Sequence, residues 1–381
     1  MSDQEDEHTI AEDIVVTKYK MVGDIVNRVL KKIIEKCVAG ASVRELCIQG
    51  DKFIEEETSS VFKREKDMKK GIAFPVCLSV NNCINHYSPL SSDTDTTLND
   101  GDLVKIDFGA HLDGFISVAG HTVVVGSSKE NKVTGRKADV MLAAYYAAEA
   151  ALRMIKPGNQ NYAVTDIINK IAAVYKCKPV EGMLSFQLQQ GRIDGEKTII
   201  QNPSEAQRKE VEKCEFETHD VFGIDVIIST GEGVGREMES RVTVYRKTDE
   251  AYSLKLKASR EFYSKVQKSF GMMPFNLRSF EEEKKARMGV NECVTHGLVE
   301  PYPVVWEKPN EVVAQFKYTV LLMPNGPNRI TPLLFDVDAF QSEYSIEDEE
   351  IKKIITGSLN IKSAAKKKKK KKNSEKTKVP A

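Results

Sequence analysis

The sequence lacks the features that mark secreted and membrane-spanning proteins. Its 381 residues hold seven scattered cysteines with no C-x-x-C pair, so no disulfide framework is indicated. No apolar run reaches about 18 residues, the length needed to span a membrane. The acidic start has no basic region followed by an apolar one, so we expect no signal peptide. These absences predict a reduced protein of the cytoplasm or nucleus, without membrane insertion.

The formal net charge of the chain is zero, but the charges are unevenly distributed along it. Residues 1–13 carry six acidic side chains and no Lys or Arg, while residues 362–381 carry ten Lys and one Glu. The simplest interpretation of such ends is a solubilising, disordered segment, but a lysine block also binds polyanions by releasing their counterions. We expect an acidic segment over 1–13, one domain over 14–361 and a disordered tail over 362–381. The tail contains Lys366, Lys367, Lys368, Lys369, Lys370, Lys371 and Lys372.

A β-hairpin is predicted for residues 104–125. An apolar strand contains Asp107, a turn follows at Asp113-Gly114, and a second apolar strand comes after it. A carboxylate inside an apolar run needs a cation, a metal or several hydrogen-bond donors. Residues 220–225 repeat the pattern of 102–107, namely Asp, two apolar residues, a variable residue and then Ile-Asp. The repeat predicts two βα halves that each deliver an Asp from a buried strand.

Three further features surround this pair of aspartates. Residues 138–156 and 163–175 have the pattern of helices, and Thr9-x-x-Glu12 and Ser42-x-x-Glu45 read as capping boxes that start two more. His86 lies in a polar turn before the hairpin. Residues 312–323 predict a buried strand with Lys317 in its middle, which is anomalous because lysine is rarely buried without a partner.

Basic residues gather in two places. The stretch 63–70 is compatible with a solvated helix end or with a patch for nuclear import or RNA. Residues 254–300 predict two basic amphipathic helices followed by strands, either a small winged-helix-like insert or surface helices with solvated charges. The candidate contacts to RNA or ribosomes, besides the tail, are Lys69, Lys70, Lys255, Lys257, Arg260, Lys265, Lys268, Lys284, Lys285 and Arg287.

Several stretches resemble a known family. Residues 80–89, 105–109, 223–225 and 314–317 resemble the type-2 methionine aminopeptidases. The segments at 9–13, 16–20, 68–75, 194–203 and 321–327 are closer still to the proliferation-associated, ErbB-binding proteins of that superfamily. The resemblance covers roughly residues 10–340. It implies an α/β (α+β) pita-bread fold of two pseudo-symmetric halves, with a type-2 helical insert at about 250–305.

The resemblance also implies that the metal site is lost. Active members hold two metal ions with two Asp, one His and two Glu. Aligned by these motifs, the first Asp falls on Asp107 and the first Glu on Asp225, one methylene shorter. The other positions fall on Val118, Phe186 and Lys317. Val and Phe donate nothing to a metal, and an ammonium repels one. We expect no metal cofactor and no catalysis, with Lys317 acting as a counter-ion to both aspartates.

Two functions remain in view. The first is a non-catalytic protein that binds ribosomal RNA, the large ribosomal subunit and other structured RNA, in ribosome biogenesis and translation control. The resemblance adds growth signalling through an ErbB-type receptor, transcriptional co-repression, and a place in the cytoplasm and nucleus or nucleolus, and we expect a monomer. The co-repressor motif L-x-x-L-L is imperfect here, as residues 351–355 read Ile-Lys-Lys-Ile-Ile. The alternative is a hydrolase or aminopeptidase, metal-free or with a remodelled metal site, that uses His86 in a vestigial pocket with Asp107 and Asp225.

Overall fold

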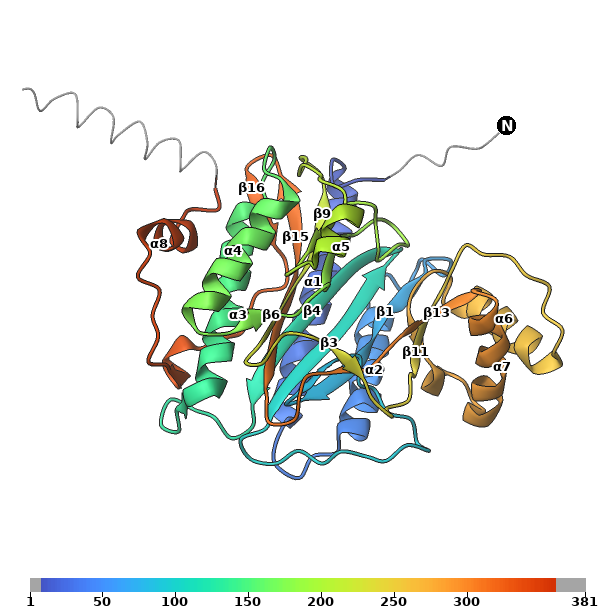
Figure 1. Ribbon diagram of the computed structural model, residues 1–381. Coiled ribbons are helices and arrows are strands. Elements are labelled where there is room, and N and C mark those ends of the chain that lie inside the picture. The colour runs from blue at the N-terminus through green and yellow to red at the C-terminus, as the bar shows by residue number, and fades with distance from the viewer. Residues whose placement is uncertain (1–7, 361–381) are drawn as a thin grey trace, which may run out of the picture.

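A computed structural model describes residues 8–360, and at its centre lies a nine-stranded sheet (Figure 1). The main path runs β1-β3-β4-β15-β9-β7-β8, with β16 paired to β15 and β6 to β9. The strands are β1 (Lys70–Val80), β3 (Leu103–Leu112), β4 (Phe115–Val124), β6 (Lys178–Pro179), β7 (Leu184–Gln187), β8 (Thr198–Ile200), β9 (Val221–Ser229), β15 (Val313–Met323) and β16 (Gly326–Arg329).

Two pairs of helices cover the same face of this sheet. The first pair is α1 (Asp13–Lys36) and α2 (Val43–Ser60), and the second is α3 (Gly135–Met154) and α4 (Asn161–Val174). Side chains alternate between the faces of a strand. Ile106 and Phe108 of β3 therefore join the core under α1 and α2, while Phe316 and Tyr318 of β15 join the core under α3 and α4. The intervening residues, Asp107 and Lys317 among them, face the opposite side.

The insert is a smaller unit at the right of Figure 1. Its sheet has the order β12-β11-β13 and packs against two helices, and its aromatic core includes Phe262 and Phe275. The buried side chain of Arg278 connects the insert to the body, since its Nε donates to Asp51 Oδ2 at 2.7 Å and its Nη2 donates to the carbonyl of Val76 at 3.0 Å. The elements are β11 (Val244–Lys247), α6 (Lys257–Ser269), β12 (Phe275–Asn276), η1 (Leu277–Ser279), α7 (Glu283–Thr295) and β13 (Val299–Tyr302).

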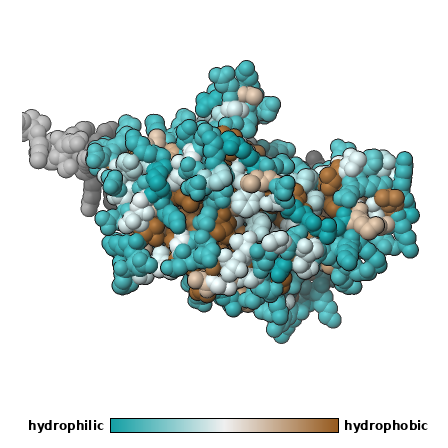
Figure 2. Space-filling view, turned by 60° about the horizontal axis from the view of Figure 1, so that its bottom comes forward, coloured by the Kyte–Doolittle hydropathy of each residue, from teal (hydrophilic) through white to brown (hydrophobic). Residues whose placement is uncertain are grey.

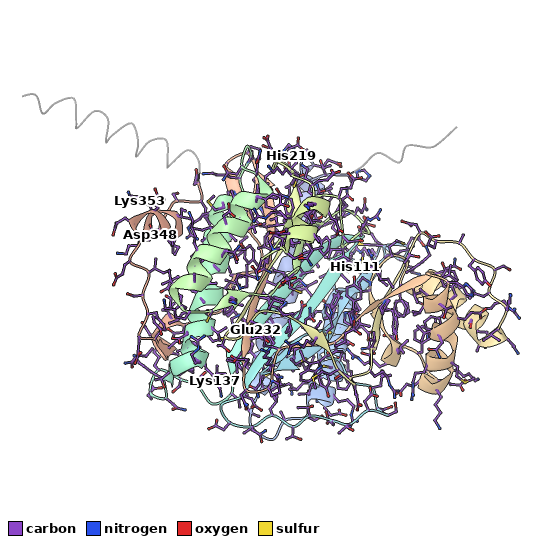
Figure 3. The ribbon with its side chains drawn as sticks, in the orientation of Figure 1. His111, Lys137, His219, Glu232, Asp348 and Lys353 are labelled. Carbon is purple, nitrogen blue, oxygen red and sulfur yellow. The ribbon has the colours of Figure 1, made fainter. Side chains whose placement is uncertain are left out.

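Shorter elements complete the described chain. One small sheet has the order β10-β14-β2, and another pairs β17 with β5. In Figure 3, Asp348 and Lys353 mark α8 at the left, on the side opposite the insert. No helix among residues 8–360 is long and apolar enough to cross a membrane. The elements are β2 (Cys83–Asn85), β5 (Val133–Thr134), α5 (Glu205–Glu210), β10 (Arg236–Glu237), β14 (Val305–Trp306), η2 (Val337–Ala339), β17 (Phe340–Gln341) and α8 (Glu349–Ile355).

The predicted hairpin is confirmed, but some helix boundaries are corrected. Ser42 caps α2 as expected, accepting the N–H of Glu45 at 3.1 Å. The capping box at Thr9 is wrong, because α1 starts after Glu12 and no side chain caps it. The basic stretch 63–70 is not a helix end. The helix stops at Ser60, and residues 63–69 form a connection into β1. Local capping patterns are shared by turns, so they misplace a helix start by several residues.

Candidate functional site

Four residues form one row across four neighbouring strands. Asp107 on β3 pairs with Gly120 on β4, Gly120 pairs with Lys317 on β15, and Lys317 pairs with Asp225 on β9. Register partners in adjacent strands present their side chains to the same face. The row therefore brings two carboxylates and one ammonium together on the face that the helices leave uncovered.

Glycine is required at the second position of this row. A Cβ built on Gly120 would lie 2.7 Å from the Cβ of Lys317, closer than two carbon atoms can approach. Because Gly120 has no side chain, the Lys317 chain extends across β4 toward β3. Glycine inside a strand often marks such a close approach. Sequence reasoning did not single out Gly120.

Lys317 bridges the two aspartates, as predicted. Its Nζ lies 3.1 and 3.2 Å from the two carboxylate oxygens of Asp107, and 3.4 Å from Oδ2 of Asp225. Asp107 is 4% exposed and Asp225 is 6% exposed, so both carboxylates are desolvated. The ammonium also stands 5.4 Å from the ring centre of Phe74. Lys317 thus supplies the counter-charge that the two buried carboxylates require.

A second donor on β15 completes the cluster. The amide nitrogen of Gln315 donates to Asp225 at 2.8 and 3.1 Å, and it lies 3.5 Å from Oδ2 of Asp107. Gln315 and Lys317 are two residues apart on one strand, so both point to the same face. This period of two was the signal that could have identified Gln315 from the sequence.

Burial and the neighbouring opposite charges shift the pKa values of Asp225 and Lys317 in opposite directions. Burial raises the pKa of Asp225 to about 6, although the Lys317 ammonium lowers it, and the neighbouring Asp107 raises it further. Burial by itself lowers the pKa of Lys317, but the two carboxylates outweigh burial and the net pKa is raised. Lysine therefore remains charged at every physiological pH, and the cluster holds a permanent internal cation.

The remaining predicted ligand positions line a cavity beside this cluster. The cavity has a volume of about 630 Å³, and Val118, Phe186, Asp225 and Lys317 all face it. Val118 is 1% exposed, and a Cβ built on Gly109 or on Gly223 would lie 3.0 Å from one of its two methyl groups. The structure therefore brings together the positions that the resemblance assigned to metal ligands, and fills three of them with an isopropyl group, a phenyl ring and an ammonium.

His86 lies at the rim of the same cavity but belongs to a different cluster. Its Nδ1 is 3.1 Å from the carbonyl oxygen of Pro303, so Nδ1 carries the proton and donates. The ring lies between Phe74 and Tyr302, with centroids 5.8 and 5.2 Å away. Burial lowers the pKa of His86 to about 4, which leaves a neutral imidazole. Its Nε2 is an acceptor that makes no hydrogen bond with the described residues.

The described residues do not fit a metal. Within residues 8–360 no group of three or more His, Cys, Asp or Glu side chains is arranged to hold an ion. Two carboxylates remain, and both already accept from Lys317. A divalent ion needs several oxygen or nitrogen donors and is repelled by an ammonium at the same place. No two-metal step is available to this site.

The basic candidates are scattered over the insert and the body. The seven lysines at 366–372 lie outside the described residues. On the insert, Lys257 pairs with Glu261 at 3.7 Å, and Lys285 pairs with Glu282 at 2.6 Å. Lys265 stands 4.9 Å from the ring centre of Phe280. Lys69 is exposed, whereas Lys70 donates to the carbonyls of Val61 and Phe62 and is not free. Lys255, Arg260, Lys268 and Lys284 are exposed, and Arg287 is half-buried.

A two-halved sheet with one row of charged residues on its open face defines a pita-bread protein of the methionine aminopeptidase type. The methionine aminopeptidase of Thermotoga maritima shares this fold at a TM-score of 0.55 and 16% identity, covering 84% of this chain and 97% of that one. The chain belongs to metallopeptidase family M24, whose model matches residues 17–255.

Its relatives are more informative than the family model. The chain is 47% identical to "ERBB-3 binding protein 1" of Arabidopsis thaliana, over 91% of this chain and 87% of that protein. It is 44% identical to "Proliferation-associated protein A" of Dictyostelium discoideum, over 94% and 92%. A solved thermophilic Arx1 matches at a TM-score of 0.85 and 34% identity, covering 92% of this chain and 99% of that one. The expected family and fold are confirmed.

Proposed function

We propose that the chain is a non-catalytic pseudo-aminopeptidase that binds RNA and the large ribosomal subunit. The observation that carries the first half is the position of Lys317, whose ammonium lies between Asp107 and Asp225 where catalysis would need divalent metal. A family fold that keeps its shape without its ligands is free to serve as a binding scaffold.

The second half rests on the charge of the insert. Residues 255–268 carry five cations, Lys255, Lys257, Arg260, Lys265 and Lys268, against the single carboxylate of Glu261. Lys255 and Lys268 are exposed and have no carboxylate within 4.0 Å among the described residues. The insert lies at the right of Figure 2, where its surface is mostly hydrophilic. Lys268 lies on α6 and Lys255 lies two residues before it, and cations clustered along one face in this way are the electrostatic footprint of nucleic-acid binding.

The neighbouring helix contributes less than its lysines suggest. Glu281, Glu282, Glu283 and Glu292 surround Lys284, Lys285 and Arg287, so residues 281–292 have an excess of acid. We assign the RNA contact to residues 255–268 together with the Lys-rich tail. The receptor role follows the name of the ErbB-3 binding relatives, and the places of action proposed are the cytoplasm and the nucleus or nucleolus.

Co-repressor contacts through residues 351–355 have a structural obstacle. Ile351 is 4% exposed, and Ile354 and Ile355 pack against the core under α3 and α4. The apolar face of α8 is therefore already occupied by the body of the protein. Such contacts require α8 to detach first.

Ribosome sedimentation with matched charge reversals tests the proposal. The variant K255E/K257E/K268E reverses three lysines of the insert, and K20E/K31E/K36E reverses three exposed lysines on α1 as a control. We expect the insert variant to co-sediment at least ten-fold less at equal salt, and the α1 control to behave as the wild type. Equal loss in both variants, or in neither, would contradict the assignment.

A hydrolase without metal is the second candidate. It is favoured by the free Nε2 of His86 at a cavity of about 630 Å³. An imidazole with an unoccupied acceptor is able to take a proton from a nucleophile. Peptide hydrolysis by the purified protein, with and without cobalt or manganese, separates the two functions. Turnover that disappears in His86→Asn would establish the hydrolase and overturn the first proposal.

A further inference from the structure

An exposed turn of the body contacts the insert away from the cavity. Residues 90–93 form a β-turn closed by the N–H of Asp93 and the carbonyl of Leu90 at 3.1 Å. The Asp93 carboxylate accepts the N–H of Leu90 at 2.9 Å. Ser91 and Ser92 are the central residues of this turn, and both are exposed. The turn is thus well ordered by its own hydrogen bonds while its two hydroxyl groups are accessible.

Two arginines point at one of these hydroxyls. Arg287 Nη1 on α7 is 3.2 Å from Ser92 Oγ, and Arg241 Nη1 is 3.5 Å from the same atom. The two guanidinium groups come from chain segments 46 residues apart, so the folded structure alone brings them to Ser92. Arg241 also pairs with Asp93, since its Nε lies 3.2 Å from Oδ1, while its Nη1 faces Ser92 Oγ. Two arginines around one oxygen are the arrangement that binds a phosphate group.

There is room for a larger group at this position. One cavity of about 670 Å³ is lined by Ser92 and Arg241, and a second of about 550 Å³ is lined by Arg241, Lys284 and Arg287. Arg241 lines both cavities. Ser92 lines the first of these cavities, so a phosphate on Ser92 has open space next to Arg241.

The unmodified turn uses a carboxylate in place of a phosphate. Glu283 accepts from Ser92 Oγ at 2.5 Å, from Ser91 Oγ at 2.5 Å and from the N–H of Ser91 at 3.2 Å. Glu283 is the first residue of α7. A phosphate on Ser92 would repel the Glu283 carboxylate from its present position, while the two bonds to Ser91 are made by the other carboxylate oxygen.

We propose that Ser92 is a phosphorylation site, and that its phosphate binds Arg241 and Arg287 to fasten the turn to the insert. The modifying partner is a protein kinase that recognises acid after serine, because Asp93 and Asp95 follow. Ser92 Oγ forms a bond to the γ-phosphorus of ATP, the bond from that phosphorus to the bridging oxygen breaks, and ADP leaves. The hydroxyl proton passes to a base of the kinase.

The phosphate changes the contact physically. It adds about −1.5 to −2 charges and three acceptor oxygens, which form charge-assisted hydrogen bonds with guanidinium groups. It also lies beside the start of α7, where a helix dipole favours negative charge. The contact between the turn and the insert already contains the ion pair of Asp93 Oδ1 with Arg241 Nε at 3.2 Å, and the phosphate adds further negative charge between Arg241 and Arg287.

Phosphorus NMR on the full chain with phosphoserine incorporated at position 92 tests the geometry. The second pKa of a free phosphoserine is about 6, and we expect this phosphate to titrate at a clearly lower pH. The shift should disappear in the same protein carrying R241Q/R287Q. Phosphoserine at exposed Ser60, whose hydroxyl donates to the backbone carbonyl of Glu57 at 2.6 Å, is the matched control. Titration at position 92 equal to that at position 60 would overturn the proposal.

Kinase labelling tests the modification itself. The full chain is incubated with ATP and an acidophilic kinase of the casein kinase type, and the modified residue is located by mass spectrometry. We expect incorporation at Ser92 in the wild type and in Ser91→Ala, and none at this turn in Ser92→Ala. Absence of label on Ser92 in the wild type, or label that moves with Ser91→Ala, would reject Ser92 as the site.

Discussion

Lys317 reaches Asp107 only because the residue between them in the sheet is Gly120. The three residues stand on adjacent strands in one row, and the lysine chain passes over the glycine to the carboxylate 3.1 Å from its Nζ. The ion pair at the centre of the fold thus depends on a missing side chain as much as on the charges. This relationship gives the first two predictions.

Removing the ammonium should destabilise the protein strongly. Lys317→Met leaves Asp107 and Asp225 buried without a counter-charge, which typically costs on the order of 3–5 kcal/mol of unfolding free energy. Urea denaturation at pH 7 measures this. The control D107N/D225N/K317M removes the charges together and should recover at least half of the loss. A single variant as stable as the wild type would show that the pair contributes nothing.

A methyl group at Gly120 should disturb the same pair. Gly120→Ala places a Cβ 2.7 Å from the Cβ of Lys317 and forces the strands apart, at a cost of about 1–3 kcal/mol for overpacking. In a Lys317→Gly background the new methyl meets no Cβ, so the cost should fall. A double-mutant cycle by thermal denaturation measures the coupling. Additive effects would contradict the contact.

Acid should weaken the fold through its buried histidines. His121 is 3% exposed, and burial lowers its pKa to about 4 from an ordinary 6.5. Above pH 6.5 the ring is neutral in both states. Between pH 6.5 and 4 the unfolded chain binds a proton at this position and the folded chain does not. The free energy of unfolding therefore falls as pH falls, by up to about 3 kcal/mol. Burial lowers the pKa of His86 and His111 to about 4 as well, which adds to the fall.

Asp225 acts in the opposite direction. Burial raises its pKa to about 6, so its contribution to stability decreases as pH rises from about 4 to 6. Burial also raises the pKa values of Asp51 and Glu55, so the histidine contribution is measured as a difference between a histidine variant and the wild type. Unfolding free energies at pH 4.5 and 7 should differ less in His121→Leu than in the wild type. His296→Leu, at an exposed position, is the control and should leave the difference unchanged.

Substitutions at the three former metal-ligand positions should restore metal binding. Val118, Phe186 and Lys317 face one cavity with Asp225, so V118D/F186H/K317E returns two oxygen donors and one nitrogen donor to a shared site. We expect the triple variant to retain cobalt or manganese after gel filtration, measured by elemental analysis. The wild type and Val118→Asp alone serve as controls. Stoichiometric metal in the wild type would contradict the loss of the metal site.

Salt dependence should reveal what the tail contributes to RNA binding. The logarithm of the binding constant falls with the logarithm of salt by about 0.7 to 0.9 for each phosphate neutralised. Deletion of residues 362–381, which carry ten Lys and one Glu, should flatten this slope for ribosomal RNA. A tail of equal length with serine at each lysine controls for length. An unchanged slope would exclude the tail from the contact.

The sequence alone was sufficient for the main elements and for the charge conflict at the centre. Alternation of apolar residues placed the hairpin around Asp107, and the repeat of its pattern placed Asp225 on a second buried strand. A lysine inside an apolar strand required a partner, because burial of an unpaired charge is too costly. The two aspartates were the only predicted buried anions, and the structure pairs Lys317 with both.

Only the tertiary structure decided register and spatial proximity. Strand pairing placed Gly120 beside Lys317, 197 residues away, and Gln315 beside Asp225, 90 residues away, and no local pattern encodes that alignment. Local spacing likewise could not show that His86 donates to Pro303, or that Arg241 and Arg287 meet at Ser92. Chemistry is carried by residue types, which the sequence states, but contact depends on how distant segments pack, which only the folded chain determines.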